Sequence, residues 1–160
     1  MIRLPLDTAD VDAFSLPFHD QPVVVLGADK NDRARSRFDA AYELGHLAAH
    51  GDQVWAVKEV EEQAHWFAAD FLMPASNIAH ELPPRSDWSR LFDLKREWQV
   101  SLGALLMRAR ALGRMSEGQY LTAVKAASAR GCAGGRSPPS DVTVAVIRCH
   151  LLPPRDGRTP

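Results

Sequence analysis

Hydrophobic residues recur at two different spacings along the chain, and the change separates a strand region from a helical region. Residues 22–27 read Pro-Val-Val-Val-Leu-Gly, a short β-branched run closed by glycine, which predicts a strand. Residues 1–20 carry apolar positions interrupted by Pro5 and Pro17. We expect extended or irregular chain there, covering one edge of the core.

From Arg33 onward the apolar residues recur every three or four positions, which is the period of an amphipathic helix. Polar residues that favour helix N-caps precede several of these segments, and glycines that end helices follow them. The pattern predicts helices over about 33–50, 57–72, 87–98, 102–112 and 116–130, with a helical turn near 76–80. The expected caps are Asp29, Asn31 or Asp32 for the first helix, then Asp87, Ser101 and Ser116.

Two of these helices have a definite predicted buried stripe. In the first it comprises Phe38, Ala41, Gly45 and Ala48, and glycine inside a helix suggests that something packs closely there. In the second it comprises Val60, Ala64, Phe67, Ala68 and Phe71. Together the elements predict an α+β fold that is mostly helical, with a small N-terminal β-sheet and about five helices.

The composition changes abruptly after Gly131. Residues 132–160 hold five of the 11 prolines, no glutamate and both cysteines, Cys132 and Cys149. At 160 residues and 46% hydrophobic, the chain is long enough to bury one core. We therefore expect one domain over 1–131, with a helical subregion over 87–131, followed by a Pro/Gly-rich, disordered tail over 132–160 with one possible strand at 142–147.

Charge and cysteine content narrow the classes of function. The formal net charge of −1 argues against a dedicated electrostatic nucleic-acid binder. No apolar run approaches the roughly 20 residues of a membrane helix, and no signal-peptide pattern opens the chain. Two cysteines near one end make no disulfide framework for the core. We expect a cytoplasmic protein without membrane contact.

The segment Tyr-Glu-Leu-Gly-His at 42–46 differs in one residue from the metal-binding pattern H-E-x-x-H. That pattern places two histidines on one helix face with a glutamate between them as general base. Glu43 and His46 fit, and Tyr42 stands in place of the first histidine. Four-residue spacing also relates His46 to His50, but Leu47 then stands where the base belongs.

Three segments of the sequence carry a family resemblance. Residues 35–46 read Arg-Ser-Arg-Phe-Asp-Ala-Ala-Tyr-Glu-Leu-Gly-His, and residues 61–74 read Glu-Glu-Gln-Ala-His-Trp-Phe-Ala-Ala-Asp-Phe-Leu-Met-Pro. Residues 100–113 read Val-Ser-Leu-Gly-Ala-Leu-Leu-Met-Arg-Ala-Arg-Ala-Leu-Gly. Over about residues 22–131 the chain resembles the ImmA/IrrE family of zinc metallo-endopeptidases, which implies a zincin-like fold.

The resemblance implies a Zn²⁺ site between the first two helices. Its ligands would be Tyr42, His46 and Glu61, and Glu43 would activate the metal-bound water. Glu61 fits better than Glu62 because of its spacing to Ala64. His65 stands where the family has Asp or Asn, a position suited to supporting a ligand from behind.

Tyr42 leaves three interpretations of this site open. A phenol with an ordinary pKa near 10 is a poor ligand at neutral pH, although a bound zinc lowers that pKa. Zinc binds Tyr42 in the first interpretation, and the alternative ligand His50 in the second. In the third, metal binding is lost or weakened, and the Tyr42 hydroxyl fills the site with a hydrogen bond to Glu61 or His46.

Two hypotheses of function follow from the resemblance. In the first hypothesis, the chain is a zinc endopeptidase that cleaves a repressor-type regulatory protein in stress response or mobile-element control, and Tyr42 impairs its activity. Alternatively, it is a pseudo-protease that only binds such a protein and so takes part in transcription regulation.

A third hypothesis comes from residues 87–114, which also resemble a helix-turn-helix. Arg108, Arg110 and Arg114 would then contact DNA phosphates. We favour the interpretation that the hairpin packs on the rest of the domain, so direct DNA binding is not expected. The residues that would pack it are Trp88, Leu91, Leu105 and Leu106.

Overall fold

A small sheet is followed by a series of helices in the computed structural model, which describes residues 1–6, 11–18, 20–28, 32–49 and 58–131. The strands are β1 (Ile2–Leu4), β2 (Ala13–Leu16) and β3 (Val23–Gly27). The helices are α1 (Arg33–Ala49), α2 (Lys58–Leu72), α3 (Ala75–Ile78), α4 (Trp88–Trp98), α5 (Leu102–Ala111) and α6 (Glu117–Ala129). The expected fold class, mostly helical α+β with a small N-terminal sheet, is confirmed.

The three strands form one sheet in the order β1-β3-β2. β1 runs parallel to β3, with Ile2 opposite Val25, and β2 runs antiparallel to β3, with Phe14 opposite Val25. The predicted strand is the central one, and Val24, Val25 and Leu26 are buried. Where we expected extended or irregular chain, the structure has two short edge strands, which end just before Pro5 and Pro17 because proline cannot continue a hydrogen-bonded ladder.

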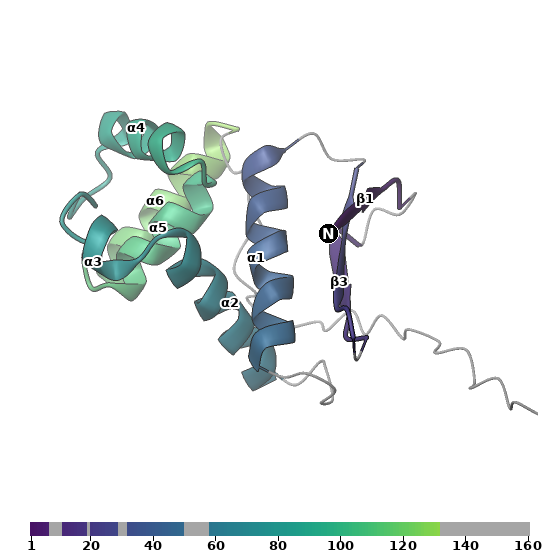
Figure 1. Cartoon of the computed structure of the whole chain (residues 1–160). Coiled ribbons are helices and arrows are strands. Elements are labelled where there is room, and N and C mark those ends of the chain that lie inside the picture. Colours follow the sequence, from purple (N-terminus) through teal and green to yellow (C-terminus); the bar gives the residue numbers. More distant parts are fainter. Residues whose placement is uncertain (7–10, 19, 29–31, 50–57, 132–160) are drawn as a thin grey trace, which may run out of the picture.

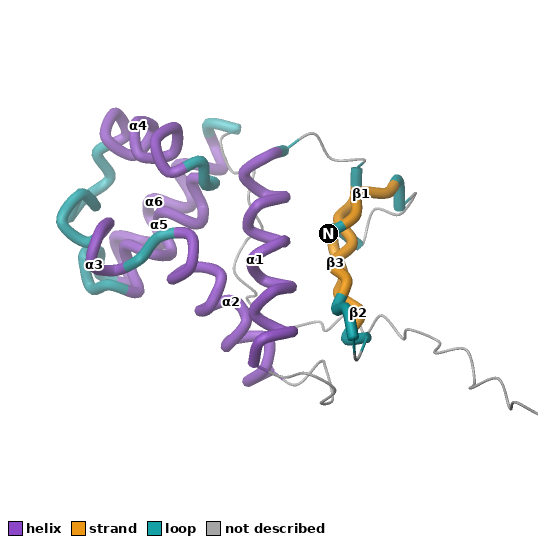
Figure 2. The backbone as a smooth tube through the Cα atoms, viewed as in Figure 1, coloured by secondary structure: helices purple, strands orange, loops and turns teal. Residues whose placement is uncertain are grey.

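Helix α1 lies between the sheet and the other helices, as Figures 1 and 2 show. Its approach to α2 is close at Gly45. A Cβ atom at this position would lie 3.0 Å from Phe67 Cδ1 and 3.2 Å from the Ala64 Cα atom. Ala64 and Ala68 on α2 are fully buried. The expectation that something packs tightly against Gly45 is therefore confirmed.

Among the described residues, an apolar core lies between α3, α4, α5 and α6 and the segments that join them. Its fully buried members include Met73, Ile78, Leu82, Leu91, Leu94, Leu105 and Leu106. Side-chain caps begin three of these helices. Asp87 accepts a hydrogen bond from the Arg90 amide and Ser101 from the Ala104 amide, and Ser116 forms a capping box with Gln119.

The glycines predicted to end α5 and α6 have φ of 69° at Gly113 and 66° at Gly131, in the left-handed region that glycine adopts most readily. Asp32 accepts a hydrogen bond from the Arg35 amide at the start of α1. The sequence-based caps in the described residues are thus confirmed.

Two residues of the predicted buried stripes are exposed instead. Ala48 lies exposed in the last turn of α1, and Phe71 near the end of α2 is 59% exposed and stacks on Phe67. Periodicity identifies a helix face, but it does not say how far along that face the neighbouring helix extends. His50, Asp29, Asn31, both cysteines and the strand expected at 142–147 lie outside the described residues.

None of the helices in the described ranges combines the length and the apolar character that a membrane span requires.

Candidate functional site

Facing side chains of α1 and α2 bring Tyr42, His46 and Glu61 together. The Tyr42 hydroxyl donates a hydrogen bond to Glu61 Oε2, and His46 Nε2 lies 3.8 Å from Glu61 Oε1. The rings of Tyr42 and His46 meet edge to face, with centroids 4.7 Å apart. The two residues lie four positions apart on α1, so they share one helix face and meet the same carboxylate.

This cluster is buried at one end and open at the other. The side chain of His46 is 3% exposed, whereas that of Glu61 is 38% exposed. A ligand would therefore approach from the side of α2 and meet the carboxylate first.

Glu43, the predicted general base, forms a hydrogen bond with a residue of the sheet. Its side chain is buried and accepts a 2.6 Å hydrogen bond at Oε2 from Ser15 Oγ on β2. Ser15 was not foreseen, because a serine 28 positions away in a short strand carries no local signal of such a contact. A nearby ion pair between Asp12 and Arg35 adds a second link between this segment and α1.

His65 lies on α2 beside the cluster and packs against aromatic rings. Its ring centroid is 5.0 Å from that of Phe38 and 6.4 Å from that of Tyr42. The position is one from which it contacts a member of the cluster, as expected of a supporting residue. Its role remains a prediction.

The donor set does not fit a three-ligand zinc site. Catalytic zinc keeps three protein ligands and an open position, and each ligand must be deprotonated at the donor atom. His46 and Glu61 are zinc-type ligands, but Tyr42 directs its hydroxyl proton at the Glu61 carboxylate. Within the described residues, no three His, Cys, Asp or Glu side chains are grouped so that they could hold a metal ion. The alternative ligand, His50, lies outside those residues.

The arginines of the α4–α5 hairpin are engaged within the molecule. Arg108 is 4% exposed, donates to the Met73 carbonyl at 2.9 Å and pairs with Asp70. Arg110 pairs with Glu117 and lies over the Tyr120 ring, and Arg114 donates to the Leu82 carbonyl. Because these guanidinium groups already bind protein groups, the structure favours packing of the hairpin over phosphate contact, and the expectation of no direct DNA binding stays a prediction.

The alternative, that the hairpin packs into the domain, is confirmed. Leu91, Leu105 and Leu106 are fully buried, and Trp88 packs against the same core. Burial also raises the pKa of Tyr120 above its ordinary value, an effect that the nearby Arg110 opposes.

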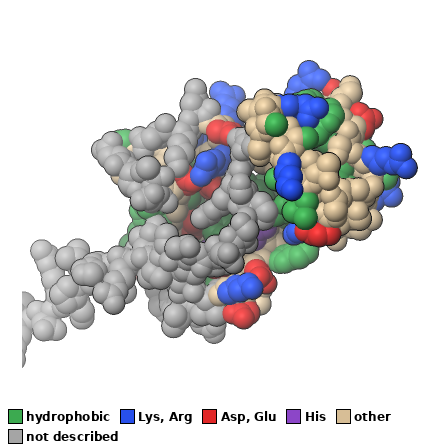
Figure 3. Space-filling model, turned by 180° about the vertical axis from the view of Figure 1, so that it is seen from behind, with side chains coloured by type: hydrophobic (Ala, Val, Ile, Leu, Met, Phe, Trp, Pro, Cys, Tyr) green, Lys and Arg blue, Asp and Glu red, His purple; other side chains and the backbone are tan. Residues whose placement is uncertain are grey.

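In Figure 3, the Lys and Arg side chains on the face in view form separate groups between acidic and apolar ones. The described residues of that face thus form no continuous basic surface for DNA.

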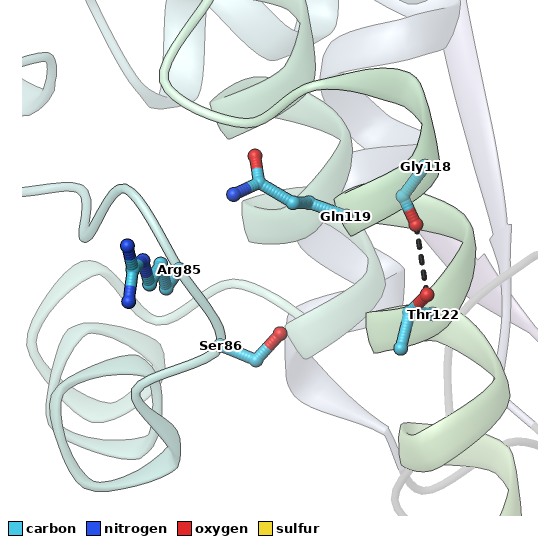
Figure 4. Close-up of a pocket in the computed structure, with 5 residues that line it drawn as sticks. All are labelled: Arg85, Ser86, Gly118, Gln119 and Thr122. Carbon is cyan, nitrogen blue, oxygen red and sulfur yellow. Dashed lines mark hydrogen bonds between the residues drawn. The ribbon is translucent and has the colours of Figure 1, made fainter.

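A hollow between the loop before α4 and the start of α6 lacks the residues of a catalytic centre. It is lined by Arg85, Ser86, Gly118, Gln119 and Thr122 (Figure 4). Thr122 Oγ1 donates to the Gly118 carbonyl, and Gln119 is used in the capping box of α6. With no carboxylate, imidazole or thiol in its lining, the hollow offers neither a general base nor a metal ligand, and the α1–α2 cluster is the candidate site.

Comparison with known proteins identifies the family. Among curated proteins, none matches the chain. The family model of the IrrE N-terminal-like domain (Peptidase_M78) matches residues 1–110, which include the sheet, α1, α2 and nearly all of α5. This is a peptidase family whose members are generally metal-dependent, so the role it indicates is metallopeptidase-like. The chain belongs to the family of IrrE N-terminal-like domains.

Proposed function

We propose that this protein is a metallopeptidase-like module that binds a repressor-type regulatory protein without hydrolysing it. The observation that carries the proposal is the hydrogen bond from the Tyr42 hydroxyl to Glu61 Oε2. Membership of a peptidase family supports a scaffold made to receive a polypeptide. The altered donor set removes the metal-dependent chemistry while leaving that scaffold in place.

The chemical reason lies in the proton of the phenol. For zinc to enter, Tyr42 must lose a proton whose ordinary pKa is near 10, and Glu61 must exchange its hydrogen bond for a metal bond. Each of these steps opposes binding at neutral pH, because metal ligands must be deprotonated. Two remaining ligands, His46 and Glu61, hold zinc less tightly than three.

A second candidate function is a zinc-dependent endopeptidase that acts on the same kind of regulatory protein. The 3.8 Å separation of His46 Nε2 and Glu61 Oε1 favours it, because the two groups are close enough to bind one metal ion. Glu43 lies one turn before His46 on the same helix, where the family motif has its base. This candidate requires a third ligand, which would be Tyr42 as a phenolate or the alternative ligand His50.

Zinc content of the purified protein separates the two candidates. We expect far less than one zinc per chain in the wild type by atomic emission. The Tyr42→His variant restores an imidazole at the third position and should bind one zinc with an affinity higher by orders of magnitude. A Tyr42→Phe variant is the matched control, since it keeps the ring and adds no ligand.

Stoichiometric zinc in the wild type that is lost in His46→Ala would contradict the binding-module proposal and support the peptidase. A chelator-sensitive cleavage of a fluorescent casein substrate by the wild type would do the same. Unchanged zinc content in Tyr42→His would mean that position 42 does not face the metal position at all.

A further inference from the structure

The outer face of α2 carries an exposed tryptophan among carboxylates. Glu59, Glu62, Trp66 and Asp70 are all exposed and follow one another at three- and four-residue spacing, so they form one stripe. The stripe lies opposite Ala64 and Ala68, which are buried against α1. Trp66 is 56% exposed, and among the described residues it is the largest exposed hydrophobic side chain. We call these four residues the α2 outer face.

The charge of this face is negative where it meets solvent. The side chain of Asp70 is 66% exposed, whereas its partner Arg108 is 4% exposed, so the carboxylate faces outward and the guanidinium inward. Lys58 stands 3.8 Å from Glu62, but both side chains are more than half exposed, and such surface pairs contribute little. Carboxylates therefore lie one helical turn on either side of the Trp66 ring.

We infer that the α2 outer face is the docking surface for a cationic segment of the partner protein. An arginine or lysine stacks well on an indole ring, and neighbouring carboxylates bind the same guanidinium or ammonium group. Tryptophan is also among the residues that contribute most at protein interfaces. An arginine of the partner placed over Trp66 would meet Glu62 and Asp70 at its edges.

The inference rests on the proposed function and names the chemistry of the partner. A regulatory protein that binds DNA carries lysine and arginine on the surface that contacts phosphates. An acidic helix with a central tryptophan complements that surface. The partner's basic segment would then bind either DNA or this face, so docking here releases the partner from DNA.

Charge also argues against other occupants of the face. A second copy of this chain would bring one acidic stripe against another, which like-charge repulsion disfavours. Nucleic acids and anionic membranes are repelled for the same reason. A cationic protein segment is the occupant that the exposed groups favour.

The test measures binding of the full chain to a fluorescein-labelled helical peptide that carries four arginines among alanines, by fluorescence anisotropy. We expect binding that weakens as salt is raised and that falls at least tenfold in Trp66→Ala. Glu62→Lys should weaken it similarly. The matched controls are Leu121→Ala, an apolar truncation at a 49% exposed position on α6, and Glu97→Lys, an exposed charge reversal on α4. Both controls should bind as the wild type does.

Equal binding of the peptide by wild type and Trp66→Ala would overturn the inference, as would equal binding of a peptide with glutamates in place of the arginines. A dimer in sedimentation that Trp66→Ala abolishes would also overturn it, because a second copy would then occupy the face. Trp66→Ala leaves Tyr42, His46 and Glu61 in place, so its zinc content should equal that of the wild type. The zinc measurement and the docking measurement can therefore fail independently.

Discussion

The α1–α2 interface and the core around α4, α5 and α6 are built from different kinds of side chain. The first joins alanine and glycine surfaces around a polar cluster of Tyr42, His46 and Glu61. The second consists of leucine, methionine and other apolar residues that are fully buried, between helices with side-chain caps. The helical core therefore supplies most of the apolar stabilisation, and the interface holds the polar groups of the candidate site.

The largest loss of stability is expected from a substitution in the helical core. Leu105→Ala removes a fully buried side chain, and we expect the free energy of unfolding to fall by about 2–5 kcal/mol. Leu121→Ala on α6, where the side chain is 49% exposed, should change it by less than about 0.5 kcal/mol. Urea denaturation of both variants measures the difference. Equal losses would mean that the two leucines do not differ in burial.

A smaller effect is expected where α1 and α2 approach each other. Gly45→Ala gains about 1 kcal/mol of helix propensity but forces a methyl group against the Ala64 backbone, a crowding that costs about 1–3 kcal/mol. We expect a net loss of up to about 2 kcal/mol.

The matched control is Gly118→Ala on α6, where an added Cβ meets nothing within 4 Å and stability should stay level or rise. Thermal unfolding, monitored by circular dichroism, shows whether each of the two variants is more or less stable than the wild type. A stabilised Gly45→Ala variant would show that α2 yields to the added methyl group.

The smallest effect concerns the hydrogen bond that joins the two helices in the site. Tyr42→Phe removes only the hydroxyl that donates to Glu61, and we expect a loss of about 1 kcal/mol in the free energy of unfolding. A double-mutant cycle with Glu61→Ala isolates the bond between the two side chains. A coupling free energy near zero in that cycle would indicate that the two groups do not interact in solution.

Much of the fold was predictable because its signals are local. Helix periodicity, N-cap residues and terminal glycines each act within a few positions, and the capped helices begin and end within a residue or two of the predicted bounds. The strand β3 was equally predictable, because it is a run of β-branched residues. β1 and β2 were less so, because strands of three and four residues beside prolines become regular only by pairing with β3.

The candidate site likewise contains some contacts that the sequence indicated and others that it did not. The spacing of Tyr42 and His46 and the motif of the second helix indicated that both would meet Glu61, and they do. The bond from Ser15 to Glu43 and the burial of Arg108 against Asp70 join residues 28 and 38 positions apart. Nothing in the local sequence marks such pairs.

The sequence by itself therefore determined the helices, the central strand, the family and the residue that breaks the metal motif, since each depends on near neighbours or on motif spacing. The tertiary structure alone decided the contacts around those residues. It directed the Tyr42 hydroxyl at Glu61, turned Arg108 inward and left Trp66 exposed among carboxylates. These outcomes depend on how separate elements pack, a three-dimensional arrangement that one-dimensional spacing does not specify.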